Sequence, residues 1–518
     1  MKKWVKTACF WWLLIAISVF SPLLFFLGFG VSDDLSFVGN IDPNFLNDLS
    51  YSLSRPGHLS RPLYGLIQTS TLHLFRENYL WYNILRLGIW LLIIYQSNKV
   101  FRSFFKNDSR WIFIFFISFP VFASAHLFNF FQMGYLLSLF FFLLALGAIK
   151  DDSGGFTQKR NLRYVILGLL ALFSCEIVFP LFIFPILYNH WSKLSGIFRS
   201  KLLYRTSLIF ILFLLFKFFI GPLYQTEATI YGFHPSVNSV LQSMYYFVVI
   251  LFEIPLLLIE VIPFFMSEVT IWLSLLAIPL FYTVNRHNNF DYNRKFFSVL
   301  VITLSFCSLI FFISNYPAVS FGIYNKMLLP SHLLYGLLLA IVCLRLIRTK
   351  FYVIGYAIGV LWLASMQMQS INSIRSWELR QDKLKAYVTI LNKEKKENQY
   401  FFIQAPYFLP SNYNNEHVFA LNDDFQGGLL LSGIQGNHRE VYPFCSLMLE
   451  DGNYFANHNI YKTIKENKLS TFDVLLADGR LKRNETLKSL NHLSLSSQRE
   501  CFRSRLRSYF IRQMEVLK

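Results

Sequence analysis

Long apolar runs separated by short polar segments occupy the first 370 or so residues of the chain. A helix needs about 20 apolar residues to cross a bilayer, so each long run is a candidate span. The pattern predicts an all-α polytopic membrane domain with about eleven transmembrane helices. The runs are Cys9–Phe29, Tyr79–Gln96, Trp111–Phe128, Gln132–Ile149, Tyr164–Tyr188, Val240–Met266, Val269–Val284, Phe296–Ile313, Leu329–Leu344 and Phe351–Met366.

Composition supports a membrane protein and gives the basic residues a topological meaning. The chain is 54% hydrophobic and 15% charged, whereas soluble domains carry about 25% charged residues. Its net charge of +18 gathers in short loops between the runs, where Lys and Arg mark the cytoplasmic side rather than a nucleic-acid surface. Lys2, Lys3 and Lys6 precede a first run that is too long for a signal-peptide core, so we expect a retained first span.

Two middle segments allow different traces. Tyr164–Tyr188 is either one span or a hairpin broken near Glu176 and Pro180. The loop from Asn189 to Arg205 carries four basic residues and no acidic one, which favours a cytoplasmic loop and therefore the hairpin. Val240–Met266 would then dip into the membrane from outside without crossing. Either trace gives about eleven crossings and places the C-terminus outside.

Two polar regions are predicted on the outer side. The first is the loop 31–78, in which Pro43–Ser52 and Pro62–Phe75 have the spacing of helices lying at the membrane interface. The second begins where the membrane domain 1–368 ends: 369–518 is predicted to be a small α/β periplasmic domain. It is entered by a helix at Ile374–Leu391 and contains β-like runs at 400–403 and 472–476.

Only Cys445 and Cys501 lie in the polar C-terminal region. An oxidising compartment would allow these two cysteines to form a disulfide.

An acidic pair, Asp33 and Asp34, follows the first run at the outer membrane surface. Acidic residues are favoured at helix starts, so either residue would serve as a cap of the next helix. A carboxylate at this place could equally act as a general base. From the residues alone, the two interpretations stay open.

Basic residues follow in the same loop. Arg55, His58 and Arg61 lie in a segment with prolines at 56 and 62, and guanidinium groups held by rigid turns suit a phosphate. The alternative is anchoring at lipid head groups. Lys326 and Tyr324 lie in a later outer loop, where a basic residue opposes the positive-inside trend and favours a ligand role.

Three further polar sites have weaker functional readings. Glu176 is placed well inside an apolar helix, where it is either functional or bonded to backbone exposed by the break at Pro180. His126 is interpreted as a structural polar contact. Asp423 and Asp424 are interpreted as the start of a solvated helix before Gly427.

An acidic pair after the first span, two interfacial helices in the first outer loop, about a dozen spans and an outer C-terminal domain together resemble the GT-C glycosyltransferases. Within that superfamily, Asp33-Asp34 followed by Arg61-Pro62-Leu63 is similar to bacterial O-antigen glucosyltransferases of serotype conversion. The resemblance implies an inverting enzyme in the bacterial inner membrane. It would move glucose from a polyprenyl phosphate donor to a lipid-linked glycan such as the O-antigen of lipopolysaccharide.

The resemblance also implies residue roles. Asp33 would be the catalytic base, and Asp34 would orient the acceptor or a metal ion. Arg55, Arg61 and Lys326, with His58 and Tyr324, would hold the donor phosphate. The residues define no metal site, and the resemblance leaves a divalent metal open as a cofactor. The expected partners are the two lipid-linked substrates and membrane lipids, with no nucleic acid.

Two other functions remain as alternatives. An O-antigen polymerase usually has its largest outer loops in the middle of the chain, whereas here the polar mass is C-terminal. A flippase or transporter commonly shows inverted repeats and paired broken helices, which are not evident in this sequence.

Overall fold

The computed structural model describes residues 2–29, 34, 38–39, 41–54, 61–102, 104–105, 109–150, 158–191, 197–198, 200–220, 237–285, 294–314, 318, 320, 322–393, 401–403, 441–443, 472–475 and 480–485. The α-helices are α1 (Lys2–Phe25), α3 (Phe45–Ser54), α4 (Pro62–Phe75), α5 (Tyr79–Phe101), α6 (Arg110–Ser118), α7 (Ala125–Phe128), α8 (Met133–Lys150), α9 (Gln158–Ser174), α10 (Ile183–His190), α11 (Lys201–Leu215), α12 (Val237–Val248), α13 (Ile254–Glu260), α14 (Ala277–Asn285), α15 (Arg294–Phe306), α16 (Leu309–Ser314), α17 (Leu329–Leu346) and α18 (Tyr352–Lys393).

Short 3-10 or π segments join several of these helices. They are η2 (Phe130–Gln132), η3 (Glu176–Phe182), η5 (Phe216–Ile220), η7 (Val249–Glu253), η8 (Ile262–Phe265), η9 (Val269–Leu276) and η10 (Gly322–Leu328).

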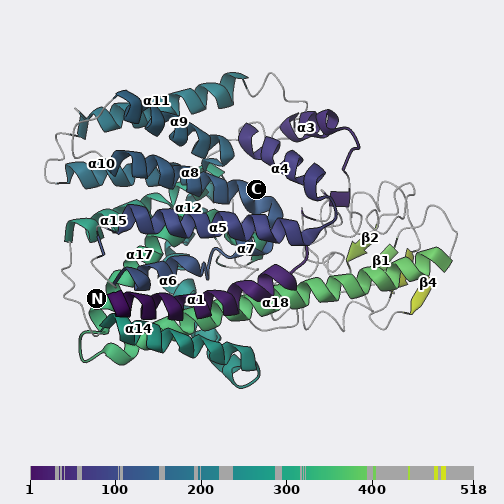
Figure 1. The fold of residues 1–518 in the computed structure, drawn as a ribbon. Helices are drawn as coiled ribbons and strands as arrows, with labels where there is room; N and C mark the ends of the chain where they lie inside the picture. Colours follow the sequence, from purple (N-terminus) through teal and green to yellow (C-terminus); the bar gives the residue numbers. More distant parts are fainter. Residues whose placement is uncertain are drawn as a thin grey trace.

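The longest helix, α18, runs along the helical bundle and projects beyond it (Figure 1). The sequence predicts a span ending at Met366 and a separate helix at Ile374–Leu391, but the structure joins them into one helix of 42 residues. At about 1.5 Å per residue, this helix is about twice as long as the hydrocarbon core is thick. We call the end of the bundle from which α18 projects the projecting end. Figure 1 places the N-terminus at the opposite end.

Five described helical stretches are long and apolar enough to cross a membrane, judged by length and composition: Thr7–Phe25, Lys201–Ile220, Ser239–Phe265, Arg294–Ile313 and Asn325–Leu346. They differ in burial. Only 17% of the most apolar part of Lys201–Ile220 is buried, against 78% for Asn325–Leu346. Large apolar side chains on α1 and α11 are exposed, among them Ile17, Phe25, Ile211 and Leu215. Exposed apolar helices of this length fit lipid contact, so the chain is a multi-pass membrane protein.

Fewer stretches meet the length criterion than the eleven expected because several are shorter or broken. The run Trp111–Phe128 is one such case: α6 ends at Ser118, and the chain is irregular until α7 begins at Ala125. Pro120 lies in the break and has no backbone N–H to continue a helix.

Side chains from three other helices satisfy carbonyl groups at this break. Trp90 Nε1 donates to Ser118 O (2.9 Å), and Gln369 Nε2 donates to Val121 O (2.5 Å). His332 Nε2 lies 3.1 Å from Ile117 O. Irregular backbone at membrane depth is tolerated where protein groups replace the missing bonds, as here.

The run Tyr164–Tyr188 is divided into α9, η3 and α10. α10 returns toward the end opposite the projecting end, because Tyr188 packs on Phe104 (5.1 Å between ring centroids) and Lys295 Nζ lies 4.4 Å from the centre of the Tyr188 ring. These contacts fit a broken hairpin. Glu176 is the first residue of η3, so it lies at the break of the favoured hairpin trace and not within one continuous apolar span. α9 ends at Ser174, two residues earlier.

The apolar stretch Ser239–Phe265 forms polar contacts with residues 318 and 320 and, through Leu257 O, with Ser365 of α18. Gln242 Oε1 accepts from Ala318 N (3.0 Å), and Glu253 Oε2 accepts from Ser320 Oγ (2.8 Å). Glu268, just after it, forms a bidentate ion pair with Arg375 in the distal half of α18 (2.7 and 3.1 Å). Whether this stretch crosses the membrane or returns to the same side stays a prediction from the sequence.

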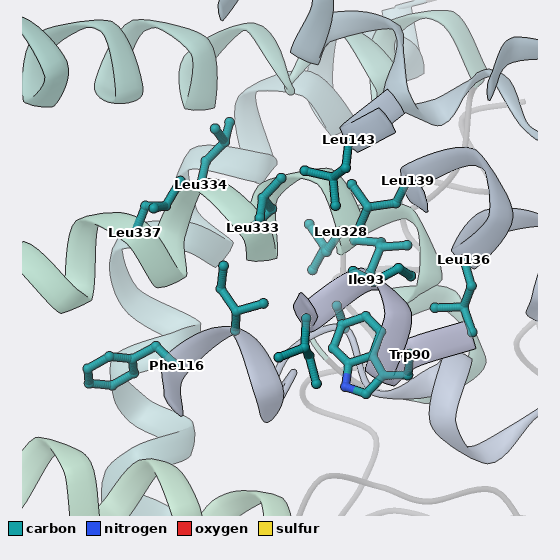
Figure 2. Packing of buried hydrophobic residues seen from close by; sticks show 14 of the residues in the cluster. Trp90, Ile93, Phe116, Leu136, Leu139, Leu143, Leu328, Leu333, Leu334 and Leu337 are labelled. Carbon is teal, nitrogen blue, oxygen red and sulfur yellow. The ribbon is translucent and has the colours of Figure 1, made fainter. Parts of the chain in front are cut away.

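The core lies where α5, α8 and α17 meet α6. Figure 2 shows Trp90 and Ile93 of α5 beside Leu136, Leu139 and Leu143 of α8, with leucines of α17 closing the space. All of these side chains are almost fully buried. Burying apolar area here makes a rigid centre from which the helix ends at the projecting end are positioned.

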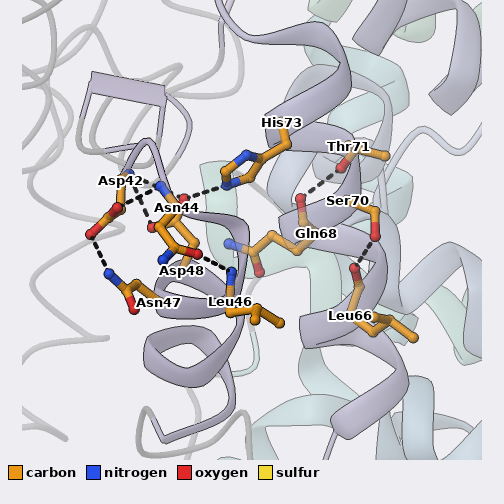
Figure 3. A network of polar contacts seen from close by, with 10 residues as sticks. All are labelled: Asp42, Asn44, Leu46, Asn47, Asp48, Leu66, Gln68, Ser70, Thr71 and His73. Carbon is orange, nitrogen blue, oxygen red and sulfur yellow. Dashed lines mark hydrogen bonds and ion pairs between the residues drawn. The ribbon is translucent and has the colours of Figure 1, made fainter.

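The first outer loop forms a helical pair. α3 and α4 agree closely with the two interfacial helices expected at Pro43–Ser52 and Pro62–Phe75. They are joined by Asp48 of α3, whose Oδ2 lies 2.8 Å from His73 Nε2 of α4 (Figure 3). The same carboxylate accepts from the backbone N–H of Asp42 (3.1 and 3.2 Å). This network fixes α4 and therefore the residue that precedes it, Arg61.

Beyond α18 the described segments are strands: β1 (Phe401–Ile403), β2 (Val441–Pro443), β3 (Phe472–Leu475) and β4 (Leu481–Glu485). They form a sheet of order β2-β1-β3-β4, in which β1 is parallel to β2 and β3, and β4 is antiparallel to β3. β1 and β3 coincide with the two β-like runs in the sequence. The α/β class of 369–518 stays a prediction.

Candidate functional site

The centre of the candidate site is an ion pair between Arg61 and Glu176. Arg61 Nε donates to Glu176 Oε2 (2.7 Å), and Arg61 Nη2 donates to Glu176 Oε1 (3.0 Å). Arg61 is the N-cap residue of α4, with Pro62 at the first helical position, where its fixed φ suits a helix start. Both side chains are mostly buried, at 18% and 26% exposure. A two-point contact of this kind fixes the orientation of the guanidinium plane.

Two lysines join Arg61 in this region, one beside the Glu176 carboxylate and one beside the Tyr135 ring. Lys217 Nζ, in η5, lies 3.7 Å from Glu176 Oε1. Lys326 Nζ, in η10, lies 5.8 Å from the centre of the Tyr135 ring, and Arg61 Cζ lies 5.6 Å from the same ring centre. We call Arg61, Lys217, Lys326, Glu176 and Tyr135 the cation cluster. Its three cations and one carboxylate leave a formal surplus of two positive charges.

Arg61 keeps its charge in this setting. Burial by itself lowers the pKa of the guanidinium, but the charge of Glu176 and its hydrogen bond raise it, and the pKa lies well above its ordinary value. Arg61 is therefore a permanent positive charge at the projecting end.

Lys326 is positioned by hydrogen bonds from its neighbours. Asn325 Oδ1 accepts from Ala125 N (2.9 Å), and Asn325 Nδ2 donates to Ser124 Oγ (3.2 Å), so η10 is held against α7. Ser320, just before η10, donates to Glu253, which also accepts from Tyr245 Oη. Glu253 is thus a positioning residue for the loop that carries Lys326.

Close packing brings the cluster together beside Gly134. A Cβ at this position would lie 2.5 Å from the Tyr64 ring of α4 and 3.1 Å from Ser174 O at the end of α9. Glycine therefore lets α4 and α9 approach α8 closely, one residue before Tyr135. Arg61 precedes α4 and Glu176 follows α9, so this approach places both partners of the ion pair.

Asp34 lies in the interior beside this region. Its side chain is 1% exposed, and its Oδ2 accepts from Phe130 N (2.9 Å) at the start of η2. It also interacts electrostatically with Arg86 and Tyr82 of α5. The contact with Phe130 is a capping contact, but to a helix 96 residues away rather than to the next helix along the chain. It ties the first outer loop to the segment that leads into Tyr135.

Other predicted site residues lie outside the described residues. These are Asp33, Arg55 and His58, together with Asp423, Asp424, Cys445 and Cys501. For Tyr324 the backbone is described, as part of η10, and the side chain is not. The structure therefore brings Arg61, Lys326 and Glu176 together and places Asp34 nearby.

Sequence reasoning missed Lys217 and Tyr135. Lys217 could have been found from the sequence. It is a basic residue near the outer end of the span that follows the loop Asn189–Arg205, and a basic residue on the outer side is the same signal that singled out Lys326. Tyr135 had none, since an aromatic residue at the start of an apolar run is common at membrane interfaces.

The arrangement suits the binding of an anion with a compact charge. Arg presents a planar fork of N–H donors and Lys a point charge, and the two are regularly combined around phosphate. Within the described part of the chain, no three His, Cys, Asp or Glu side chains are grouped as metal ligands would be. The described fold and site therefore define a multi-pass membrane protein with a cation cluster at the projecting end.

Comparisons with known proteins add little. No family model and no curated protein matches the chain. Among solved structures, it is similar to the crystal structure of ArnT from Cupriavidus metallidurans bound to undecaprenyl phosphate. The identity is 13%, the match covers 91% of this chain and 96% of that chain, and the TM-score is 0.40.

Proposed function

We propose that the chain is an inverting membrane glycosyltransferase of the GT-C type that uses a polyprenyl phosphate sugar as its donor. The observation that carries the proposal is the convergence of Arg61, Lys217 and Lys326 at the projecting end, beside the buried Asp34. In this proposal the donor phosphate lies in the cation cluster with its lipid in the membrane. The sugar faces the outer side, toward the loop of Asp33 and Asp34.

The surplus charge of the cluster suits this chemistry. A polyprenyl phosphate sugar is a phosphodiester with one negative charge. The polyprenyl phosphate that leaves is a monoester, which can carry two. Cations placed around the phosphate therefore stabilise the leaving group more strongly than the donor, which lowers the barrier rather than only tightening binding.

The reaction needs a base for the acceptor. An acceptor hydroxyl oxygen attacks C1 of the sugar, the bond from C1 to the phosphate oxygen breaks, and the hydroxyl proton passes to a carboxylate. We assign that carboxylate to Asp33. Asp34, already bonded to the backbone of Phe130, holds the loop in place. Attack from the face opposite the phosphate inverts C1.

The finer assignments rest on the sequence resemblance alone. They are glucose as the sugar, an O-antigen or other lipid-linked glycan as the acceptor, and a C-terminal domain in the periplasm of the bacterial inner membrane. Arg55 and His58 join the phosphate site in the same proposal, with Tyr324 beside Lys326.

The test is an assay of the purified full-length chain with an acceptor lipid extract and two donors, polyprenyl phosphate glucose and a nucleotide-activated glucose. Sugar transfer from the polyprenyl phosphate donor and none from the nucleotide donor is the expected result. Binding of the lipid donor without any consumption of it would support the flippase alternative instead.

A further inference from the structure

His126 of α7 is a buried polar side chain that the proposed reaction does not use. Its ring is 0% exposed, and neither ring nitrogen has a hydrogen bond of good geometry in the part of the chain that the structure describes; its only polar backbone interactions there are weak ones with Lys326 and Gln132. Buried polar groups are normally hydrogen-bonded, and leaving one without a partner costs free energy. An imidazole kept in this state needs an explanation other than its contribution to stability.

The location of His126 suggests that explanation. The ring lies 5.6 Å from the ring of Tyr135, the residue that Arg61 and Lys326 also approach. His126 also interacts electrostatically with Lys326. The four side chains reach this place from α7, α8, η10 and the start of α4.

The element that carries His126 is held firmly. Asn325 accepts from the backbone of Ala125 and donates to Ser124, immediately before His126. The residue next to Asn325 is Lys326, so one asparagine holds together the two chain segments that carry the imidazole and the ammonium group. Two neighbouring polar groups, the His126 imidazole and the Lys326 ammonium group, could bind the same ligand.

Resting on the proposed function, we infer that His126 contacts the phosphate held by the cation cluster, to which it donates a hydrogen bond. A neutral imidazole has one N–H donor and one acceptor nitrogen, so beside Lys326 it supplies a donor without adding a further charge. A phosphate oxygen is the matching acceptor, and hydrogen bonds to charged acceptors are the stronger kind. A bound phosphate would give this buried ring nitrogen a hydrogen-bond partner.

The experiment measures binding of a short-chain polyprenyl phosphate to the full-length chain in detergent, for wild type, His126→Phe and His126→Asn. Phenylalanine keeps a ring of similar shape without polar atoms, and asparagine keeps an N–H donor. We expect His126→Phe to bind about tenfold more weakly, as expected for one lost hydrogen bond to a charged group, and His126→Asn to recover part of the loss. Unfolding of the lipid-free protein should occur at the same or a higher temperature in His126→Phe, because a polar group without a partner has been removed.

His332→Phe is the matched control. His332 is also a buried histidine, but its Nε2 lies 3.1 Å from Ile117 O. Its substitution should lower the unfolding temperature and leave the affinity for polyprenyl phosphate unchanged. Inorganic phosphate, tested alone, should bind far more weakly than the lipid if the lipid carrier is the natural source of the phosphate.

The outcomes separate the two proposals. Equal affinity of wild type and His126→Phe for polyprenyl phosphate, with a lower unfolding temperature in the variant, would make His126 structural and leave the proposed function standing. Absence of binding by the wild type itself would overturn both.

Discussion

Arg61 and Glu176 are 115 residues apart in the chain and form a two-point ion pair, with N to O distances of 2.7 and 3.0 Å. The pair joins the start of α4 in the first outer loop to the turn of a hairpin in the middle of the chain. It therefore links the predicted phosphate-binding loop to the helices that surround it.

Glu176→Gln should lower stability more than activity. The substitution leaves Arg61 mostly buried without its carboxylate, so we expect the free energy of unfolding to fall by about 1–3 kcal/mol. Because the phosphate would supply a substitute anion, turnover of the folded protein should stay within about tenfold of wild type. Thermal unfolding with and without polyprenyl phosphate measures both effects, and an unchanged unfolding temperature in the empty protein would count against the pair.

Lys217→Ala and Lys326→Ala should weaken use of the donor. Each removes one cation from the cluster, and we expect kcat/KM for the donor to fall by roughly tenfold, with kcat lowered as well as KM raised and with a weaker dependence on salt concentration. Lys295→Ala is the control, since Lys295 lies over the Tyr188 ring at the opposite end of the bundle. If the three variants show the same steady-state constants for the donor, the cluster lysines do not bind the donor phosphate.

Gly134→Ala should disturb the site through packing. Alanine favours helix by about 1 kcal/mol, but its Cβ would meet the Tyr64 ring at 2.5 Å, and overpacking of this kind costs about 1–3 kcal/mol. The expected result is a lower unfolding temperature and a higher donor KM, because α4 and Arg61 are displaced. Gly88→Ala is the matched control within α5, where an added Cβ meets nothing within 4 Å. Gly88→Ala should leave the unfolding temperature unchanged or raise it. If both variants lower the unfolding temperature by the same amount, close packing at Gly134 is not the cause.

The predicted topology places the first outer loop and the C-terminal region on one side of the membrane. Single cysteines at Ser36 and at Ser470 should therefore both react with a membrane-impermeant thiol reagent in intact spheroplasts. The natural cysteines are first replaced, so that each signal belongs to one position. Protection of the Ser470 position until the cells are lysed would reverse the assignment of the C-terminal region.

Several features of the fold could be predicted from the sequence because they depend on local signals. The apolar runs gave the helices, and Pro62 marked the start of α4. The broken hairpin was favoured by the basic residues between Asn189 and Arg205, since charge near a helix end reports its side. The break after Ser118 could not be predicted because the residues on both sides of it are equally apolar. The irregular backbone is stabilised by hydrogen bonds from Trp90 and Gln369, which are distant in the sequence.

The candidate site was harder to predict because its partners are distant in sequence. Arg61 and Lys326 are recognisable in the sequence because outer loops contain few basic residues. Nothing in the sequence pairs Arg61 with Glu176. Lys217 and Tyr135 join the cluster only through the packing of α4, α8, η3 and η5. Asp34 was recognised as a capping residue or a catalytic one, and its actual partner, Phe130, is set by tertiary structure.

The central claim is that a phosphate held by Arg61 leaves as the acceptor attacks with help from Asp33, and one set of kinetic measurements tests it most directly. Transfer of labelled sugar from polyprenyl phosphate glucose is measured over a range of donor concentrations for wild type, Arg61→Ala and Asp33→Asn. We expect Asp33→Asn to fold normally and to lose roughly two to four decades of turnover at saturating donor, the contribution of a general base. Arg61→Ala should raise the donor KM and also lower turnover at saturating donor, because a cation that stabilises the leaving phosphate more than the donor acts on the transition state. Near-normal transfer by both variants would contradict the account.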